Sequence, residues 1–527
     1  MTISAGRLPQ RASARWDAAR TDEKGKPMQH SVGSTTASGI SRSVRSLRHL
    51  VGGQWRDGEG DALVDVSPAC PGERVAVGQA AQERDLDEAV AAAREAFPRW
   101  AATPHHVRGR ILDRAADVLG AHAGQWGEEL AWEEGKTRTE GVGEVRRAAE
   151  IFRYYAGEAS RPIGEVYASP RPGEQIHVVH RPIGVVAAIT PFNFPIAIPA
   201  WKIAPALSYG NTVVWKPASL VPLLAMRLAE ALVEAGLPQG VLSLLIGNGA
   251  LGGRLVEHPG VDAVTFTGST SIGRSLIAAC GQLARPVQTE MGGKNAAVVL
   301  ADADLDLAVG EVLAGAFRST GQKCTATSRL IVEEPVADDF LALLTKRAAA
   351  LRVGDPLDED TEMGPVVSLQ ARDEIHRAVE ATSASAQAQI LTGGRLYDDD
   401  RAAGAFLPPT LVELSGSHPL WSQELFGPVL AVRRAANADE ALSLVNDSEF
   451  GLAAAVFTDN LRAATAAMDR IEVGVLHINS ETAGADPHVP FGGTKHSAYG
   501  PKEQGRAARD FYTRTTTVYL RSSGGDL

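Results

Sequence analysis

Residues 183–190, IGVVAAIT, are apolar almost throughout and decide the fold. A short run of this kind is typical of a strand buried on both faces of a parallel sheet. Further strands are predicted at 212–215, 241–246 and 263–267, with a helix at about 222–234 and another before residue 263. Alternation of strands and helices predicts an α/β fold with a doubly wound parallel sheet.

The segments on either side extend this pattern. Apolar residues recur at three- and four-residue intervals from 85 to 100, which predicts an amphipathic helix. The stretch 175–180 is predicted to be a strand, and alternating patterns continue after residue 290 to about 479. The segment 510–520 is rich in Thr, Val and Tyr and is β-prone.

Length and composition restrict the class of protein. A chain of 527 residues can hold two or three compact units, and 44% hydrophobic with 22% charged residues is ordinary for a globular protein. The net charge of −11 argues against nucleic-acid binding, and no apolar run approaches the ~18 residues of a membrane span. Three cysteines without a CxxC pair indicate a reducing compartment, so we expect a cytoplasmic protein.

Residues 1–48 differ from the rest of the chain. They are rich in Ser, Arg and Gly and poor in acidic and large apolar residues. This composition predicts a disordered tail or a start site assigned too early. An organellar transit peptide has a similar composition and is the less favoured interpretation.

Three short motifs contain side chains suited to catalysis. They are PFNFP at 191–195, EMGGK at 290–294 and FRSTGQKC at 317–324. Taken alone, an asparagine before proline is a turn former, a glutamate is a surface carboxylate, and a cysteine is a small buried residue. We read the other two cysteines, Cys70 and Cys280, in that last way.

In this order and spacing, the motifs resemble the active site of a non-phosphorylating aldehyde dehydrogenase, and the resemblance runs from about residue 50 to the C-terminus. It implies oxidation of an aldehyde to a carboxylic acid by NAD or NADP. Cys324 is then the nucleophile, because a thiolate readily forms a tetrahedral adduct. Asn193 supplies an amide donor to the oxyanion, and Glu290 is the base that activates water to hydrolyse the thioester.

The resemblance also implies the aldehyde dehydrogenase fold. A Rossmann-like NAD(P)-binding domain is expected at 49–167 and 185–290, an α/β catalytic domain at 291–494, and a β oligomerisation arm at 168–184 and 495–527. In this family the terminal strand pairs across subunits, which implies a homodimer or homotetramer. No metal ion is implied.

Two glycine motifs compete for the cofactor phosphates. Residues 247–252, GNGALG, match the common GxGxxG pattern after a strand, but a single match is weak. The family instead uses Gly-Ser-Thr-x-x-Gly, which occurs at 268–273 before a helix expected after Ile272. We therefore expect Gly268, Ser269 and Gly273 at the pyrophosphate, and Gly249 nearer the adenine.

Two further elements resemble cofactor contacts of the family. Lys216 to Ser219, KPAS, resembles the element that grips the adenosine ribose, where a final glutamate favours NAD. A glutamate at this position would repel the 2′-phosphate of NADP. Ser219 carries no charge, so use of NADP, or of both cofactors, is expected beside use of NAD. Glu424 and Phe426, in ELFGP, resemble the nicotinamide element, and the alternative reading is a Gly-Pro turn.

The loop 490–495, PFGGTK, resembles the substrate mouth of the family and places Phe491 there. Family members commonly continue with Gly-Arg-Glu, whose glutamate relays protons with a lysine that matches Lys202. This chain instead has GPKE at 500–503, with one extra residue, which leaves the relay role of Glu503 open.

The aldehyde is less clearly indicated. Residues around Cys324 and at 483–491 resemble the branch that oxidises 2-oxoglutarate semialdehyde (2,5-dioxopentanoate). Arg318 and Arg161 lie where succinate semialdehyde dehydrogenases place arginines, and a guanidinium suits a carboxylate. Trp201 and Phe192 are also expected in the tunnel and would serve an aromatic aldehyde equally well.

Two alternatives remain. A coenzyme-A-acylating dehydrogenase shares the cysteine and the amide but needs no hydrolytic base, so Glu290 counts against it. An inactive homologue kept for binding or structure is the alternative from another class, because a fold does not establish a function.

Overall fold

The largest sheet in the computed structural model, which describes residues 43–521, has eight strands. Its central strands are parallel, and antiparallel strands complete both edges. In order across the sheet they are β22 (Ala498–Tyr499), β12 (Val287–Glu290), β11 (Ala263–Thr267), β8 (Val185–Ile189), β9 (Thr212–Lys216), β10 (Leu242–Leu244), β2 (His49–Val51) and β3 (Gln54–Arg56). The predicted alternation and α/β class are confirmed.

The strand sequence explains why both faces of this sheet are covered. Successive side chains of a strand point to opposite faces, and Val186 and Ala188 join one core cluster whereas Val185 and Ala187 join another. The first cluster contains residues of α2 (His105–Ala121), α3 (Ala123–Glu134), α4 (Arg138–Ala156), α5 (Ala197–Ser208), α6 (Pro222–Glu234) and α15 (Ala508–Tyr512). The second contains residues of α1 (Glu83–Ala102), α7 (Gly249–Glu257) and α8 (Thr270–Gln282).

The order of the strands marks a ligand-binding edge. From β8 the chain adds β9 and β10 on one side and then returns to add β11 and β12 on the other. In open α/β sheets, ligands bind outside the carboxyl ends of the strands at such a reversal. The carboxyl ends of β8, β9, β11 and β12 therefore define where a cofactor would lie.

A second sheet, with seven strands, follows directly. Only residues 291–294 separate the end of β12 from the start of β13, so the carboxyl edge of the first sheet leads into the amino edge of the second. Its strands, in order, are β15 (Ala388–Thr392), β16 (Thr410–Leu414), β17 (Val429–Ala435), β14 (Thr327–Glu333), β13 (Asn295–Val299), β19 (Ala453–Phe457) and β20 (Val475–Ile478), all parallel except β15.

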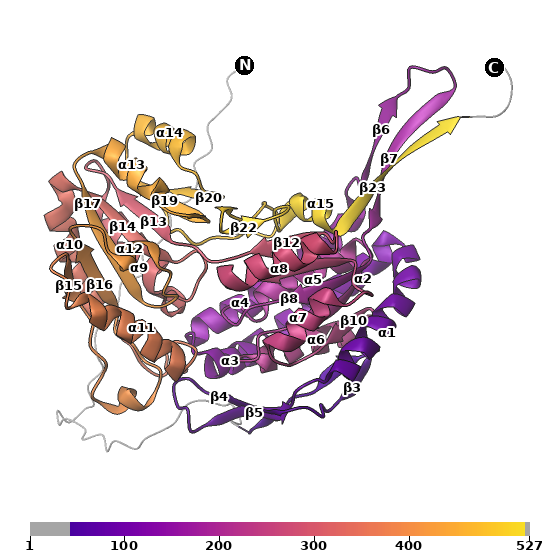
Figure 1. Cartoon of the computed structure of the whole chain (residues 1–527), viewed down its shortest axis with the longest axis horizontal. Coiled ribbons are helices and arrows are strands. Elements are labelled where there is room, and N and C mark those ends of the chain that lie inside the picture. The colour runs from indigo at the N-terminus through magenta and orange to yellow at the C-terminus, as the bar shows by residue number, and fades with distance from the viewer. Residues whose placement is uncertain (1–42, 522–527) are drawn as a thin grey trace, which may run out of the picture. The chain divides into compact units, whose positions relative to one another are not determined.

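Helices cover this sheet too (Figure 1). They are α9 (Leu305–Phe317), α10 (Glu334–Ala349), α11 (Leu369–Thr382), α12 (Pro419–Ser422), α13 (Ala438–Asn446) and α14 (Leu461–Arg470). Short 3₁₀ turns occur at η1 (Gly157–Ser160), η2 (Arg318–Gly321), η3 (Asp400–Ala403) and η4 (Gly505–Ala507).

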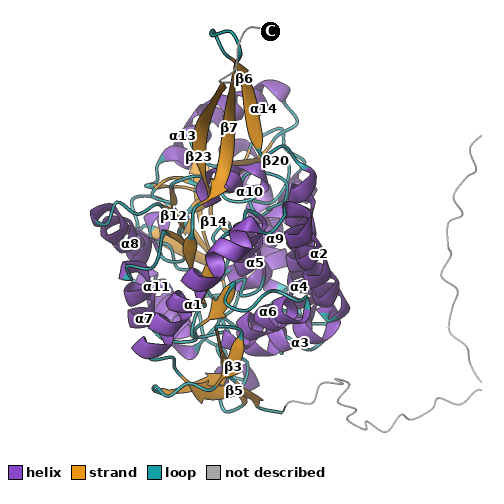
Figure 2. Cartoon of the chain, turned by 90° about the vertical axis from the view of Figure 1, so that its right-hand side faces the viewer, coloured by secondary structure: helices purple, strands orange, loops and turns teal. Residues whose placement is uncertain are grey.

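Three antiparallel strands extend away from α15 as a separate sheet (Figures 1 and 2). They are β6 (Gly164–Ala168), β7 (Glu174–Pro182) and β23 (Thr513–Arg521), with β23 paired along all of β7. Smaller sheets are formed by β1 (Arg45–Ser46), β5 (Arg74–Gln79) and β4 (Ala62–Val66), and by β18 (Phe450–Gly451) with β21 (Thr494–Lys495).

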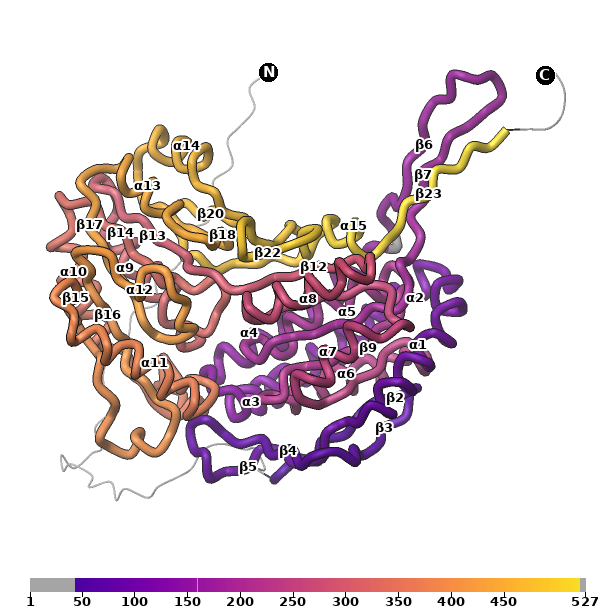
Figure 3. The backbone as a smooth tube through the Cα atoms, in the orientation of Figure 1, coloured from indigo at the N-terminus to yellow at the C-terminus, as the bar shows by residue number. Residues whose placement is uncertain are grey.

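The segment after residue 495 corrects the predicted extent of the arm. Before β23, it pairs β22 with Thr289 and Glu290 and buries α15 on the first sheet, as Figure 3 shows in yellow. Only β23 of the predicted 495–527 joins the arm sheet, and β6 extends that sheet back to Gly164 rather than 168. The division into cofactor and catalytic domains stays a prediction.

The predicted tail, residues 1–48, lies mostly outside the described residues. Its last part is corrected: Arg45–Ser46 form β1 and Leu47 is buried. None of the described helices is long and apolar enough to cross a membrane.

Candidate active site

The predicted catalytic residues lie where the two sheets meet. Glu290 is the last residue of β12, and Asn193 follows the carboxyl end of β8 by four positions. Cys324 comes three positions before β14 of the second sheet. Residues that are 129 positions apart are thereby brought together: the Asn193 side-chain amide donates to the backbone carbonyl of Gln322, at 2.8 Å.

The cysteine loop has an unusual backbone. Ser319, Thr320 and Gly321 have φ values of 52°, 54° and 69°, a conformation that costs energy for the first two. A side chain on Gly321 would lie 2.4 Å from the Gly427 carbonyl, so only glycine fits there. Tethers hold the loop in place: Glu140 accepts from Ser319 N–H at 2.7 Å, and the Thr320 hydroxyl donates to a backbone carbonyl at 3.0 Å.

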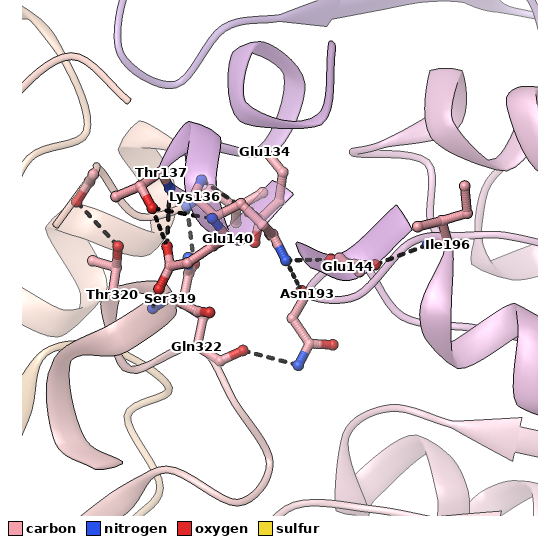
Figure 4. Close-up of polar contacts among 12 residues, drawn as sticks. Glu134, Lys136, Thr137, Glu140, Glu144, Asn193, Ile196, Ser319, Thr320 and Gln322 are labelled. Atoms are coloured by element: carbon pink, nitrogen blue, oxygen red, sulfur yellow. Dashed lines mark hydrogen bonds and ion pairs between the residues drawn. The ribbon is translucent and has the colours of Figure 1, made fainter. Parts of the chain in front are cut away.

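The start of α4 also holds the asparagine loop (Figure 4). The buried ammonium of Lys136 donates to the Asn193 backbone carbonyl at 2.8 Å and to Glu144 at 2.6 Å. Glu144 in turn accepts from the N–H groups of Ile196 and Ala197, both at 3.1 Å. The side-chain nitrogen of Asn193 carries two N–H groups. One donates to Gln322 and fixes the side chain, and the other is free to donate to an oxyanion.

Glu290 is buried behind the cysteine. Its carboxylate accepts from Gly493 N–H at 3.2 Å. Burial first, and then the charge of Glu503, raise its pKa well above the ordinary value. Glu503 forms a buried ion pair with Lys202, which also donates to Thr265 at 3.0 Å. The extra residue in 500–503 therefore does not separate Glu503 from Lys202.

The thiol of Cys324 is protonated at neutral pH in this environment. Burial, followed by the negative charges of Glu290 and Glu424, raises its pKa to about 12. A nucleophilic role therefore needs a proton acceptor nearby, and the raised pKa of Glu290 suits that role.

Cys324 lines two cavities. The larger, of about 670 Å³, is formed at the carboxyl ends of β8, β9 and β11. It is lined by the predicted cofactor residues Lys216, Ser219, Gly249, Gly268, Ser269, Glu424 and Phe426. The predicted cofactor residues thus share one cavity, with the exception of Gly273.

Gly273 lies inside α8 and packs against the sheet. The helix begins at Thr270, not after Ile272 as predicted, and a side chain on Gly273 would lie 2.4 Å from the Met291 sulfur. Gly273 thus permits close packing of helix and sheet, and the phosphate contact predicted for it has no support from this position.

The helix starts distinguish the two glycine motifs. At α7 the Asn248 side chain accepts from the N–H groups of Ala250 and Leu251, which satisfies that end. Ser269 makes no such cap at α8, so the first N–H groups of α8 stay available to an anion. The buried Thr267 hydroxyl, which lines the same cavity, also has no partner among the described residues. These features fit a dinucleotide pyrophosphate at α8.

The remaining cofactor residues differ in their surroundings. Burial lowers the pKa of Lys216 to about 8, and no acidic partner offsets the effect. Glu424 accepts from Gly293 N–H at 2.9 Å. Phe426 has a left-handed backbone, with φ of 55°. Its ring and that of Phe192 form a T-shaped pair with centroids 5.7 Å apart. Phe192, predicted to be a substrate residue, therefore lines the cofactor cavity instead.

The smaller cavity, of about 330 Å³, opens on the other side of Cys324. Trp201 and Phe491 line it with ring centroids 5.6 Å apart, and Arg318 lies at its wall. Arg161 does not reach it, because its guanidinium pairs with Glu158 and stacks on Tyr154, 4.2 Å from the ring centroid. The predicted substrate role of Arg161 has no support from the geometry.

The sequence motifs missed several side chains of this cavity. Arg147, Phe194, Lys323 and Glu481 all line it. Lys323 and Phe194 are neighbours of Cys324 and Asn193 in the chain and were within the quoted motifs, whereas Arg147 has no motif around it. No group of three or more metal-ligating side chains occurs among residues 43–521.

Comparison with known proteins decides the family. The model of the aldehyde dehydrogenase family matches residues 55–518. The chain belongs to the aldehyde dehydrogenase family. It is therefore an oxidoreductase that oxidises an aldehyde with NAD or NADP, as the sequence predicted.

Relatives of this aldehyde dehydrogenase cover nearly its whole folded length. It is 41% identical to alpha-ketoglutarate semialdehyde dehydrogenase of Haloferax volcanii and 38% identical to alpha-ketoglutaric semialdehyde dehydrogenase of Bacillus subtilis, in each case over 90% of this chain and 98% of the relative. It is also similar to the crystal structure of Staphylococcus aureus betaine aldehyde dehydrogenase with NAD+, at 31% identity and a TM-score of 0.87 over 92% of this chain and 96% of that one. The predicted fold is thereby confirmed.

Proposed function

We propose that this aldehyde dehydrogenase oxidises a short aldehyde that carries a carboxylate, of the 2-oxoglutarate semialdehyde type, to the dicarboxylic acid. The observation that carries the proposal is the set of three cations, Arg147, Arg318 and Lys323, in the wall of the cavity that opens on Cys324. Guanidinium groups bind carboxylates with paired hydrogen bonds. The names of the Haloferax and Bacillus relatives support the same substrate class.

The first step is attack of the Cys324 sulfur on the aldehyde carbon. Glu290 takes the thiol proton as the C–S bond forms, because the thiol alone keeps its proton at neutral pH. The carbonyl oxygen becomes an oxyanion, which accepts from the free N–H of the Asn193 side chain and from the Cys324 backbone. The tether between Asn193 and Gln322 keeps that donor beside the cysteine.

The second step releases the acid. A nicotinamide held near Glu424 and Phe426 would supply the acceptor for the hydride of the former aldehyde carbon. This leaves a thioester on Cys324, and Glu290 then removes a proton from water so that hydroxide adds to the carbonyl and the C–S bond breaks. Glu290 lines neither cavity, so it has to turn from Gly493 towards Cys324. The buried pair of Lys202 and Glu503 lies next to it to receive the proton.

The cofactor cavity supports use of both NAD and NADP. Gly268 and Ser269 at the start of α8 would hold the pyrophosphate, with Gly249 towards the adenine and Glu424 and Phe426 at the nicotinamide end. Lys216 offers an ammonium without an acidic partner to a ribose hydroxyl or to a 2′-phosphate. Ser219 beside it adds no negative charge.

We also propose a homo-oligomer, either a dimer or a tetramer. The arm sheet exposes several large apolar side chains, namely Val166, Tyr167, Tyr519 and Leu520. Exposed apolar patches of this kind mark protein–protein contacts.

A cytoplasmic location remains part of the proposal. It rests on the three cysteines, all of which are free thiols. Cys70 was expected to be buried, and it is exposed instead.

A second candidate substrate is an aromatic aldehyde. The paired rings of Trp201 and Phe491 in the same cavity favour it, because aromatic groups stack at such distances. The three cations in the wall favour the acid instead.

Formation of reduced nicotinamide tests the proposal. Purified enzyme is assayed with 2-oxoglutarate semialdehyde, succinate semialdehyde and benzaldehyde, each with NAD and with NADP. We expect the highest kcat/KM with the two acids. A preference for benzaldehyde would overturn the substrate class, and no turnover with any aldehyde would favour an inactive homologue. Dependence of turnover on added coenzyme A would favour the acylating alternative.

A further inference from the structure

Arg147 is a cation of the substrate cavity to which no motif of the sequence assigns a role. It lies on α4, and its side chain lines the cavity together with Cys324 and Arg318. Its side chain is 35% exposed, against 64% for Arg318. Arg147 is therefore the more enclosed of the two arginines.

The carboxylates of this cavity are already engaged by other groups. Glu140 accepts from Ser319 N–H and from Thr137, and Glu144 binds Lys136 and two backbone N–H groups (Figure 4). The Glu481 carboxylate forms ion pairs with the Arg318 guanidinium and the Lys323 ammonium, each with an N···O distance of 3.3 Å. Two of the three cavity cations are therefore paired with a carboxylate inside the cavity.

Among the described residues, the partners of Arg147 lie at the surface. They are Glu150 at 3.2 Å, whose side chain is 64% exposed, and Asp486 at 3.5 Å, whose side chain is 61% exposed. Ion pairs between exposed groups contribute little because water and salt screen them. A guanidinium has five N–H donors in a planar fork, so Arg147 can exchange these contacts for a carboxylate in the cavity at little cost.

We propose that Arg147 binds the remote carboxylate of the substrate and determines the preference for acidic aldehydes, while Glu481 holds Arg318 and Lys323 beside the cysteine loop. This rests on the proposed function, since it assumes that an aldehyde carbon lies at Cys324. The ligand class is an aldehyde with a carboxylate at the far end of a short chain. Asp486 competes with that carboxylate for the same guanidinium.

The test compares 2-oxoglutarate semialdehyde with pentanal, an uncharged aldehyde of equal carbon number, and uses the ratio of their kcat/KM values as the readout. We expect Arg147→Met to lower this ratio about 10- to 100-fold, mainly through KM for the acid, which is the usual loss of hydrogen bonds to a charged group. Arg147→Lys should restore part of the ratio, because the charge returns without the fork. Arg318→Met should lower the ratio less than Arg147→Met.

Two further variants separate recognition from structural damage. Asp486→Asn removes the competing carboxylate and should lower KM for the acid, which damage would not do. Arg146→Met is the matched control, because Arg146 is an exposed arginine on α4 outside the lining of the cavity, and it should change the ratio less than about two-fold. An unchanged ratio in Arg147→Met, or equal loss with both aldehydes that Arg147→Lys does not reverse, would overturn the inference. If the wild type itself shows no preference for the acid, the proposed substrate class fails instead.

Discussion

The two cavities that meet at Cys324 differ in the groups that line them. The cofactor cavity is lined by apolar side chains and glycines at strand ends and at a helix start, with few charged groups. The substrate cavity is walled by charged and aromatic side chains from segments far apart in the chain. A cofactor shared by a whole family is bound by the conserved geometry of the fold, whereas a particular aldehyde is bound by side chains that can change without changing the fold.

The shared cysteine is the most direct way to test whether both cavities serve one reaction. We expect Cys324→Ser to lower kcat by more than about 10⁴-fold, because the hydroxyl is a much poorer nucleophile. Cofactor binding, followed by quenching of tryptophan fluorescence, should persist because the cofactor cavity keeps its other walls. Substantial turnover by the variant would show that the two cavities do not meet at the reacting atom.

The carboxylate proposed as base should affect both halves of the reaction. Glu290→Gln is expected to lower steady-state kcat by about 10²- to 10⁴-fold. The burst of one equivalent of reduced cofactor should also become slower, because the Cys324 thiol loses its proton acceptor. Stopped-flow absorbance checks this expectation, and an unchanged burst would confine Glu290 to the second step.

The pH profile of the wild type follows from the same carboxylate. Burial and Glu503 raise the pKa of Glu290, so the base is protonated at low pH and becomes active as the pH rises through that raised value. We therefore expect kcat to increase towards alkaline pH, and Glu290→Gln to abolish the increase. A profile that falls with rising pH would contradict the assignment.

The amide of Asn193 should contribute less than either residue above. Removal of one oxyanion donor typically lowers kcat about 10²- to 10³-fold, and we expect this for Asn193→Ala with KM for the cofactor little changed. Steady-state kinetics with saturating cofactor measure the effect. Asn193→Asp is a control of equal size, and it should be no more active because its carboxylate repels the oxyanion.

The smallest effect is expected in the cofactor cavity, at Ser219, which we predict to lie near the adenosine ribose. Ser219→Glu introduces a carboxylate that accepts from ribose hydroxyls and repels a 2′-phosphate. We expect the ratio of kcat/KM for NADP to that for NAD to fall about 10-fold or more, since opposed like charges cost several kcal/mol. An unchanged ratio would mean that Ser219 lies away from the 2′ position.

Much of the first sheet and the cofactor cavity could be predicted from sequence because local signals decide them. The run at 183–190 became β8, and the helix predicted at 222–234 became α6. The sequence decided between the two glycine motifs by the family pattern at 268–273. The structure adds a physical reason, because the Asn248 side chain caps the start of α7.

The substrate cavity could be predicted only in part, because its walls depend on the packing of distant segments. Arg161 follows η1, and the direction of the chain after that short turn carries it to Glu158 and Tyr154. Arg147 reaches the cavity because of the rotation of α4 against the cysteine loop, which no periodicity in the sequence specifies. Glu503 pairs with Lys202 despite the extra residue. The loop between β22 and Glu503, which forms a β-bridge with Phe491, accommodates that residue.

The late position of β22 in the chain has a consequence for synthesis on the ribosome. This strand pairs with Thr289 and Glu290, and the segment after it delivers Glu503 to Lys202. The edge of the first sheet beside Glu290 is therefore completed by residues that are made after every strand of the second sheet. A nascent chain that stops before β22 lacks the groups around Glu290, so we expect the reactive centre to form only after the second sheet has been synthesised.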